Sequence, residues 1–315
     1  MEHECCHTSQ GDNSFTARMR FHQSWYRRHV LNLPPGPNKA AGGKLYGNVL
    51  REEDGRQGYN FLSDAIHLCA EERIRRNEGA VEPDRLRNNL LSSQPMCFNL
   101  FAPMGDDLEL ASLLAEALPG VPKGLSVRAI SLEYAPSKES HLNDRTAFDA
   151  FIEYERDGNR GFIGIETKLT EPFSQQRYEF AKPGYSRWRE NPNWWWNLGS
   201  EDCFPNPLYN QIWRNHLLAF SMLNQPNTPY NEGYCAVLHH NEDESCPKAL
   251  QQYRAHVNAD GLNTLLHWRL EDVLESWSAV VKARAHRDWL NAFRLRYLDL
   301  EASRPAWEAF QASIS

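Results

Sequence analysis

The spacing of hydrophobic positions predicts helices along most of the first third of the chain. Apolar side chains recur at every third or fourth position in four segments, residues 15–30, 61–76, 82–99 and 107–118. Proline and glycine interrupt helices, so the segment 33–43 ends the first of them, and Pro103 and Gly105 separate the third from the fourth. This part of the chain is therefore expected to be mainly helical.

An alternation of apolar and polar positions replaces the helical spacing after residue 124. It predicts three consecutive strands, residues 125–134, 146–154 and 161–168. Asp157-Gly158 lies between the second and the third, and this dipeptide favours the tight turn of a β-hairpin. A long aromatic loop then leads to a helix over 208–223 and a strand over 234–239. This order predicts an α/β fold with a mixed central sheet flanked by helices.

Helical spacing returns at residue 247 and is expected to continue to the end of the chain. We therefore divide the sequence into a helical N-terminal extension (1–84), a core that contains the sheet (85–246) and a helical C-terminal extension (247–315). A chain of 315 residues can bury a large hydrophobic core. We expect the three segments to pack as one compact domain.

The net charge of the chain excludes one class of function. With 34 Lys and Arg against 41 Asp and Glu, the formal net charge is −7. A surface coated in basic residues for non-specific nucleic-acid binding is therefore excluded, and basic patches must be local. No apolar run is long enough to span a membrane, and the acidic, polar N-terminus does not resemble a secretory signal.

The cysteines point to a reducing compartment. There are seven, scattered along the chain, and no two of them form a C-x-x-C pair. An odd, dispersed set predicts neither a disulfide framework nor a four-thiolate zinc site. We expect a cytoplasmic protein.

Three ionisable residues on the predicted hairpin are the strongest candidates for chemistry. Glu166 and Lys168 are two positions apart on one strand and so project from the same face, while Thr167 points away. The hairpin turn brings the strand of Asp149 alongside. Two carboxylates that meet in a partly buried place repel each other, and Mg²⁺, which prefers oxygen ligands, resolves the repulsion.

The expected ligands of such an ion are Asp149, Glu166 and the main-chain carbonyl of Thr167. The metal would polarise a phosphodiester and activate water, while Lys168 would orient that water or stabilise charge in the transition state. The alternative is an exposed strand with ordinary cross-strand ion pairs, since an Asp followed later by Glu-x-Lys is common by chance. The match falls on adjacent predicted strands that lie between two predicted helices. This context favours a metal site over an exposed strand.

This arrangement resembles the PD-(D/E)xK nuclease superfamily, whose shared core is αβββαβ. The similarity lies in FDAFIEYERDGNRGFIGIETKLTEPF, with Asp149, Glu166 and Lys168 at the superfamily's acidic and Glu-x-Lys positions. In particular the chain resembles a bacterial branch of restriction-endonuclease-like proteins, to whose pattern LLSSQPMCFNLF (90–101) also belongs. Phe148 stands where the nominal motif has proline. The resemblance covers about residues 85–245 and implies a restriction-endonuclease-like core.

The resemblance also implies further acidic residues near the metal. Many members carry an acid on the helix before the first strand. Glu109 and Glu116 are the candidates there, Glu133 at the end of the first strand is a third, and Gln94 on the earlier helix is another. A solvated helix surface is the simpler interpretation of Glu109 and Glu116, and the choice among the four stays open.

In such folds the helix after the third strand lies over the metal site. Here it carries a polar set, Gln211, Arg214 and Asn215, that could hold a phosphate or an active-site carboxylate. Arg214 is the better candidate for phosphate, because its planar fork matches phosphate oxygens. The alternative is a helix face in contact with solvent.

Two other patterns are candidates, one for a nucleic-acid-binding surface and one for a second metal site. Residues 177–197 interleave Arg and Lys with Tyr and Trp, as in surfaces that bind nucleic acid, although Trp194, Trp195 and Trp196 fit packing better than base stacking. His239-His240, followed by Glu242 and Asp243, suggests a second metal site. Adjacent strand residues point to opposite faces, which argues against both histidines binding one ion.

We therefore expect a metal-dependent nuclease that uses Mg²⁺, with Mn²⁺ as a substitute, and that acts on DNA rather than RNA by resemblance alone. A homodimer is left open, as are restriction, phage defence and repair. One alternative is a catalytically inactive module that binds nucleic acid or protein on the same fold. Another is a metal-dependent hydrolase of small molecules, which the net negative charge also fits.

Overall fold

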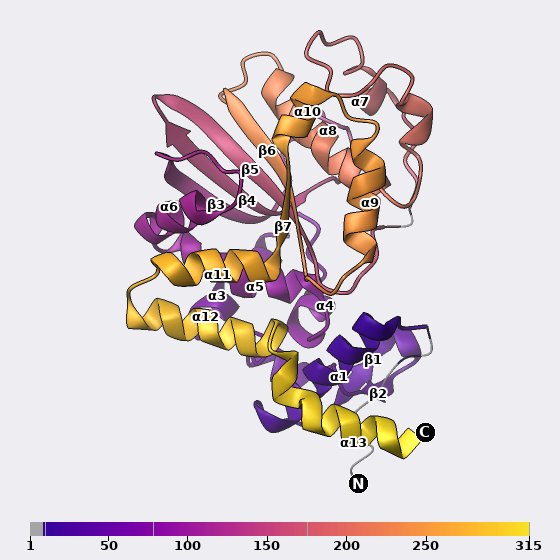
Figure 1. The fold of residues 1–315 in the computed structure, drawn as a ribbon, viewed down its shortest axis with the longest axis vertical. Helices are drawn as coiled ribbons and strands as arrows, with labels where there is room; N and C mark the ends of the chain where they lie inside the picture. The colour runs from indigo at the N-terminus through magenta and orange to yellow at the C-terminus, as the bar shows by residue number, and fades with distance from the viewer. Residues whose placement is uncertain (1–8, 10, 78, 175, 315) are drawn as a thin grey trace. The chain divides into compact units, whose positions relative to one another are not determined.

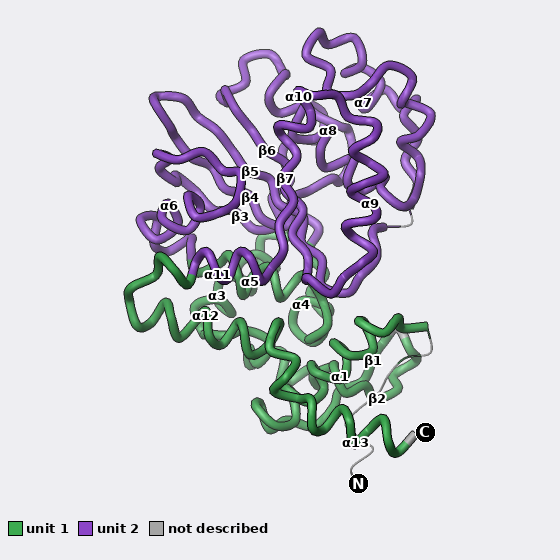
Figure 2. Tube along the Cα trace, viewed as in Figure 1, with its two compact units in different colours: residues 1–77, 81–103, 278–315 green, residues 78–80, 104–277 purple. Residues whose placement is uncertain are grey.

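A computed structural model describes residues 9, 11–77, 79–174 and 176–314, and the chain in it divides into two compact units. One unit consists of residues 1–77, 81–103 and 278–315, and the other of residues 78–80 and 104–277 (Figure 2). The division of the chain at residues 84 and 246 remains a prediction. None of the helices in the described ranges is both long and apolar enough to cross a membrane.

The first unit is mainly helical. Its elements are α1 (Ser14–His29), β1 (Gly36–Asn38), η2 (Lys39–Ala41), β2 (Lys44–Tyr46), α2 (Glu52–Arg56), α3 (Asp64–Arg76), α4 (Pro83–Asn88), most of α5 (Ser93–Gly105), α12 (Arg284–Tyr297), η4 (Leu300–Ser303) and α13 (Arg304–Ile314). Helices α12 and α13 pack against α1, so segments from both ends of the chain build this unit. Ser63 caps α3, because its Oγ accepts a hydrogen bond from the Ile66 amide at 3.3 Å.

The second unit contains the predicted sheet. Its elements are α6 (Leu108–Ala117), β3 (Ser126–Tyr134), β4 (Phe148–Arg156), β5 (Asn159–Lys168), α7 (Pro183–Ser186), η3 (Glu201–Cys203), α8 (Asn210–Asn224), β6 (Glu232–His239), α9 (Ser245–Arg254), α10 (Ala259–Thr264), β7 (Leu265–Arg269) and most of α11 (Leu270–Val280) (Figure 1). The five-stranded sheet has the order β3-β4-β5-β6-β7. The α/β class and the mixed sheet flanked by helices are confirmed.

The sheet changes direction at β5. The β3–β4 and β4–β5 pairs are antiparallel, whereas β6 and β7 run parallel to β5. Asp157 and Gly158 form the predicted turn with φ angles of 51° and 77°, both in the left-handed region that two-residue hairpin turns require. The antiparallel hairpin is thus followed by the parallel crossover through α8, as the predicted order of elements requires.

Apolar residues of α8 cover the sheet beside β5 and β6. Ile212, Trp213 and Leu217 of this helix are fully buried and pack with Phe162 of β5 and Val237 of β6. The aromatic loop closes over the same cluster, where Trp194, Trp195 and Trp196 are buried. The three tryptophans are therefore part of the core, and α8 is held against β5, the strand that carries Glu166 and Lys168.

Two expectations about secondary structure are wrong. Residues 247–315 are not helical throughout, because β7 adds a parallel strand to β6, and His267 lies on this strand rather than on a helix. Its five residues are too few for helical and strand periodicity to differ clearly, and pairing with β6 decides the outcome. Residues 82–99 form α4 and the start of α5 with a break between them, and Pro103 lies inside α5 instead of ending it.

Candidate active site

The hairpin register places Asp149 beside Glu166. Ala150 pairs with Ile165 across β4 and β5, so the next residues toward this end of the hairpin, Asp149 and Glu166, face each other. Directly opposed residues project from the same face of a sheet. Glu166 is 3% exposed, so the two carboxylates are neighbours in a place with little water.

Asp149 is anchored to the backbone of the adjacent strand. Its Oδ2 accepts hydrogen bonds from the Thr167 amide at 2.7 Å and from the Thr167 hydroxyl at 2.8 Å. The Thr167 side chain therefore contacts Asp149 and does not point away from it as expected, because Asp149 reaches across the end of the hairpin. Loss of hydration, followed by the charges of Glu166 and Glu133, raises the pKa of Asp149 well above its usual value.

Glu133 contributes the third acid of this cluster. It falls between the pairs Leu132–Ala150 and Tyr134–Phe148, which places it level with Asp149 on the neighbouring strand. Its φ of 52° lies in the left-handed region, which is rare for a non-glycine residue and costs energy. The side chain is nonetheless only 4% exposed. Glu133 is thus a buried carboxylate with a strained backbone conformation, and its negative charge acts on Asp149. Such an arrangement is expected of a functional site.

Helix α8 holds the carboxylate of Glu166 by two side-chain amides. Gln211 Nε2 donates to Oε1 and Asn215 Nδ2 donates to Oε2, each at 2.6 Å. Gln211 and Asn215 are four residues apart on the helix and so lie on one face. The polar set predicted on this helix therefore does contact an active-site carboxylate, through two of its three members.

Lys168 completes the cluster from the same strand as Glu166. It is 7% exposed, and its Nζ lies 2.8 Å from Glu166 Oε1 and 3.2 Å from Gln211 Oε1. Burial would lower the pKa of this ammonium, but the charges of Glu166 and Asp149 outweigh burial and raise it. Lys168 is thus a fixed positive charge within a group of carboxylates.

Arg214 lies apart from these residues. Its NH2 donates to Asp144 Oδ2 at 2.8 Å and to the Thr146 hydroxyl at 2.5 Å, and its guanidinium carbon lies 3.6 Å from the centre of the Tyr178 ring. It therefore joins the segment before β4 to α8. The sequence analysis did not predict that Arg214 contacts Asp144 and Tyr178. The Asp144-x-Thr146 spacing before β4 is the sequence feature that goes with the contact to Asp144.

The other candidates for a further residue near the metal are Glu109, Glu116 and Gln94. Glu109 is exposed, and Glu116 accepts hydrogen bonds from the amides of Gly124 and Leu125 at 2.6 and 3.1 Å, which anchors the loop before β3. Gln94 belongs to the other unit, where its Oε1 accepts from the Glu82 amide at 3.2 Å. Of the three candidates in the sheet unit, Glu133 is the one whose charge acts on Asp149.

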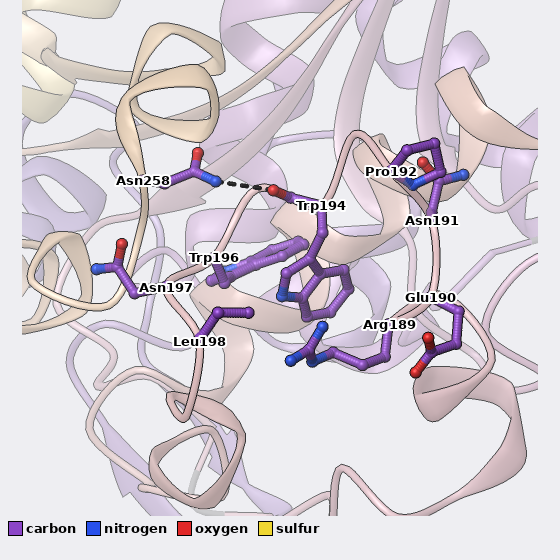
Figure 3. A pocket seen from close by; sticks show the side chains of 9 residues that line it. All are labelled: Arg189, Glu190, Asn191, Pro192, Trp194, Trp196, Asn197, Leu198 and Asn258. Atoms are coloured by element: carbon purple, nitrogen blue, oxygen red, sulfur yellow. Dashed lines mark hydrogen bonds between the residues drawn. The ribbon is translucent and has the colours of Figure 1, made fainter.

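The aromatic loop also lines a surface pocket of about 440 Å³. Figure 3 shows the rings of Trp194 and Trp196 side by side, with the Arg189 side chain next to Trp194 and Leu198 next to Trp196. Arg189 pairs with Glu201, so its charge is already balanced. The described side chains lining this pocket do not include those of the carboxylate cluster.

The donor set of the cluster suits a hard divalent cation. Asp149, Glu166 and Glu133 supply carboxylate oxygens, and one or two carboxylates with water are the usual protein ligands of Mg²⁺. Burial first, and then the charges of Glu166 and Glu133, raise the pKa of Asp149, and a bound cation would offset the repulsion among these carboxylates. Asp149 and Glu166, with the Thr167 carbonyl and Glu133 beside them, would hold such an ion.

Fold and site together define a class. An antiparallel hairpin that presents Asp on one strand and Glu-x-Lys on the next, followed by a helix and a parallel strand, is the core of the restriction-endonuclease-like nucleases. The sequence model of the PD-(D/E)XK nuclease superfamily matches residues 10–299, and the chain belongs to this superfamily. Neither a curated protein nor a solved structure matches the chain.

Proposed function

We propose that this protein is a Mg²⁺-dependent nuclease that hydrolyses phosphodiester bonds in DNA, with Mn²⁺ as a substitute ion. The observation that carries the proposal is the placement of Asp149 beside Glu166, with Lys168 Nζ 2.8 Å from the Glu166 carboxylate. Membership of the nuclease superfamily supports the reaction class. The choice of DNA over RNA rests on resemblance alone.

The residues of the cluster have distinct roles in this proposal. Asp149 and Glu166 bind the ion, with the Thr167 carbonyl and Glu133 as further ligands. When bound, Mg²⁺ supplies a Lewis acid that polarises the phosphate and favours attack by water. Lys168 places a positive charge where the pentavalent phosphorus centre gains negative charge. Gln211 is a positioning residue, because it acts through Glu166 and Lys168.

The intact cluster favours an enzyme over a binding module. A surface that only binds nucleic acid gains nothing from three carboxylates, because they repel the phosphate backbone. A strained Glu133 and a buried Glu166–Lys168 pair also cost stability, and such costs persist at functional sites.

The experiment is a plasmid-nicking assay with purified full-length protein in Mg²⁺, in Mn²⁺ and in chelator. We expect nicking with either metal by the wild type, and its loss in Asp149→Asn, Glu166→Gln and Lys168→Met. Glu155→Gln is the matched control, because Glu155 is a carboxylate of the same strand as Asp149 that pairs with Arg128 away from the cluster. Nicking by Glu166→Gln and Lys168→Met at the wild-type rate would overturn the assignment.

A further inference from the structure

A second group of metal-type ligands lies at the end of β6. It comprises His239, the last residue of the strand, Asp243 in the following turn, and Cys246 near the start of α9. One ligand atom from each lies within 4.8 Å of the others. The three residues are 0%, 5% and 1% exposed, so two polar groups and a free thiol are packed together out of water.

The backbone between β6 and α9 forms this group through local hydrogen bonds. The Asp243 amide donates to the His240 carbonyl at 3.0 Å, which turns the chain back after the strand. Asp243 Oδ1 then accepts from the amide and the hydroxyl of Ser245 at 2.9 and 2.6 Å, which forms an Asx turn at the beginning of α9 and fixes the carboxylate. Within the described ranges Asp243 Oδ2 accepts no hydrogen bond, so this oxygen can bind a ligand.

The ring of His239 is oriented by its neighbours. Nδ1 lies 2.8 Å from the His240 carbonyl oxygen, and Nε2 lies 2.6 Å from Nε2 of His267 on β7. Both ring nitrogens therefore have a partner. A metal on Nε2 would take the place of the contact with His267, while the contact of Nδ1 with the His240 carbonyl would keep the ring in place. The His240 side chain lies elsewhere, 3.3 Å from Glu271. The two adjacent histidine side chains therefore have different partners.

The donor atoms differ in kind from those of the carboxylate cluster. A nitrogen, an oxygen and a sulfur form a borderline-soft set, which favours Zn²⁺ over Mg²⁺. We propose that His239, Asp243 and Cys246 form a zinc-type metal site, separate from the carboxylate cluster. Three protein ligands leave a fourth tetrahedral position for water or for an exogenous donor.

The site is next to the candidate active site in the sheet. His239 pairs with Lys168 across the parallel strands β6 and β5. Metal binding there would tie the end of β6 to the start of α9, and so stiffen the turn beside Lys168. The spacing His-x₃-Asp-x₂-Cys is the sequence signal for the site, but two other acids and a second histidine in the same stretch obscure it.

The experiment titrates purified, metal-stripped full-length protein with Co²⁺, a spectroscopic substitute for Zn²⁺, and then displaces it with Zn²⁺. With excess Mg²⁺ present to occupy the carboxylate cluster, we expect one Co²⁺ per chain with tetrahedral d–d bands and a thiolate charge-transfer band, both removed by Zn²⁺. Cys246→Ser should abolish the charge-transfer band, and Asp243→Asn should weaken Zn²⁺ binding by at least about tenfold. Cys235→Ala is the matched control, because it removes another buried thiol and leaves the three ligands in place.

The wild-type spectrum decides the proposal even where a variant fails to fold. Octahedral Co²⁺ bands without thiolate charge transfer in the wild type would overturn it, as would wild-type Zn²⁺ affinity in Cys246→Ser. The variant Asp149→Asn separates this site from the proposed nuclease centre. It should lose nicking and keep the thiolate band, so either proposal can fail without the other.

Discussion

Gln211 Nε2 lies 2.6 Å from Glu166 Oε1, and the same amide's oxygen lies 3.2 Å from Lys168 Nζ. One side chain of α8 thus contacts both members of the Glu-x-Lys pair. The Ser174 amide donates to the same oxygen at 2.9 Å and fixes the amide's orientation. A helix residue that reaches across to two strand residues determines where the carboxylate and the ammonium lie.

Gln211→Ala is expected to disorder Glu166 and Lys168 together. A hydrogen bond to a charged group contributes about 1.5–3 kcal/mol, so stability should fall by an amount in this range. We expect the nicking rate to fall by about 10- to 100-fold, because small displacements of catalytic groups are costly. Single-turnover kinetics and thermal melts measure the two effects. Gln211→Glu, which keeps the oxygen but cannot donate as a carboxylate, should not restore activity.

Lys168→Met is expected to abolish most activity with little change in metal binding. The substitution keeps the length of the side chain and removes its charge, so a loss of about 10²–10³ in rate is the scale for one electrostatic stabiliser. Calorimetric titration with Mg²⁺ measures the binding. If the Mg²⁺ affinity fell by the same factor as the rate, the result would contradict a role for Lys168 in stabilising the transition state.

The pH dependence of the free energy of unfolding should reveal the raised pKa of Asp149. Loss of hydration and the neighbouring carboxylates raise the pKa of Asp149 well above 3.8, so between that value and its folded-state pKa the folded protein retains a proton that the unfolded chain releases. The free energy of unfolding of the metal-free protein must then decrease as pH rises through this interval.

Asp149→Asn removes this loss of stability. The variant should be more stable than metal-free wild type above the interval, and Mg²⁺ should raise the melting temperature of the wild type but not of the variant. Thermal melts across pH, with Mg²⁺ or chelator, measure both effects. Equal pH slopes for the wild type and Asp149→Asn would show that Asp149 is not the group responsible, and Glu155→Gln serves as the control.

Arg214→Ala should affect stability more than chemistry. Arg214 is 8% exposed and bonded to Asp144 and Thr146, so its removal leaves the Asp144 carboxylate without its cation. Breaking such a buried pair costs about 3–5 kcal/mol of unfolding free energy. Chemical denaturation and the rate per folded molecule test this. A rate that falls sharply while stability holds would favour the phosphate-binding role expected from the sequence.

Much of the sheet unit could be predicted because its signals are local. Alternation marks β3, β4 and β5, and Asp157-Gly158 marks the turn between the last two. The turn placed the strand of Asp149 alongside that of Glu166, but the exact register could not be read from the sequence, and the structure determines that Asp149 lies beside Glu166. The superfamily assignment rested on the same stretch, and the match over residues 10–299 confirms it.

The sequence by itself therefore determined the hairpin, the order of elements and the three residues of the motif, because each depends on neighbours along the chain. Only the tertiary structure decided that β7 joins the sheet, that Gln211 and Asn215 hold Glu166, and that Arg214 bonds Asp144 instead. Those contacts join segments dozens of residues apart. Their geometry is determined by how α8 and β6 pack on β5, and that packing leaves no periodic pattern in the sequence.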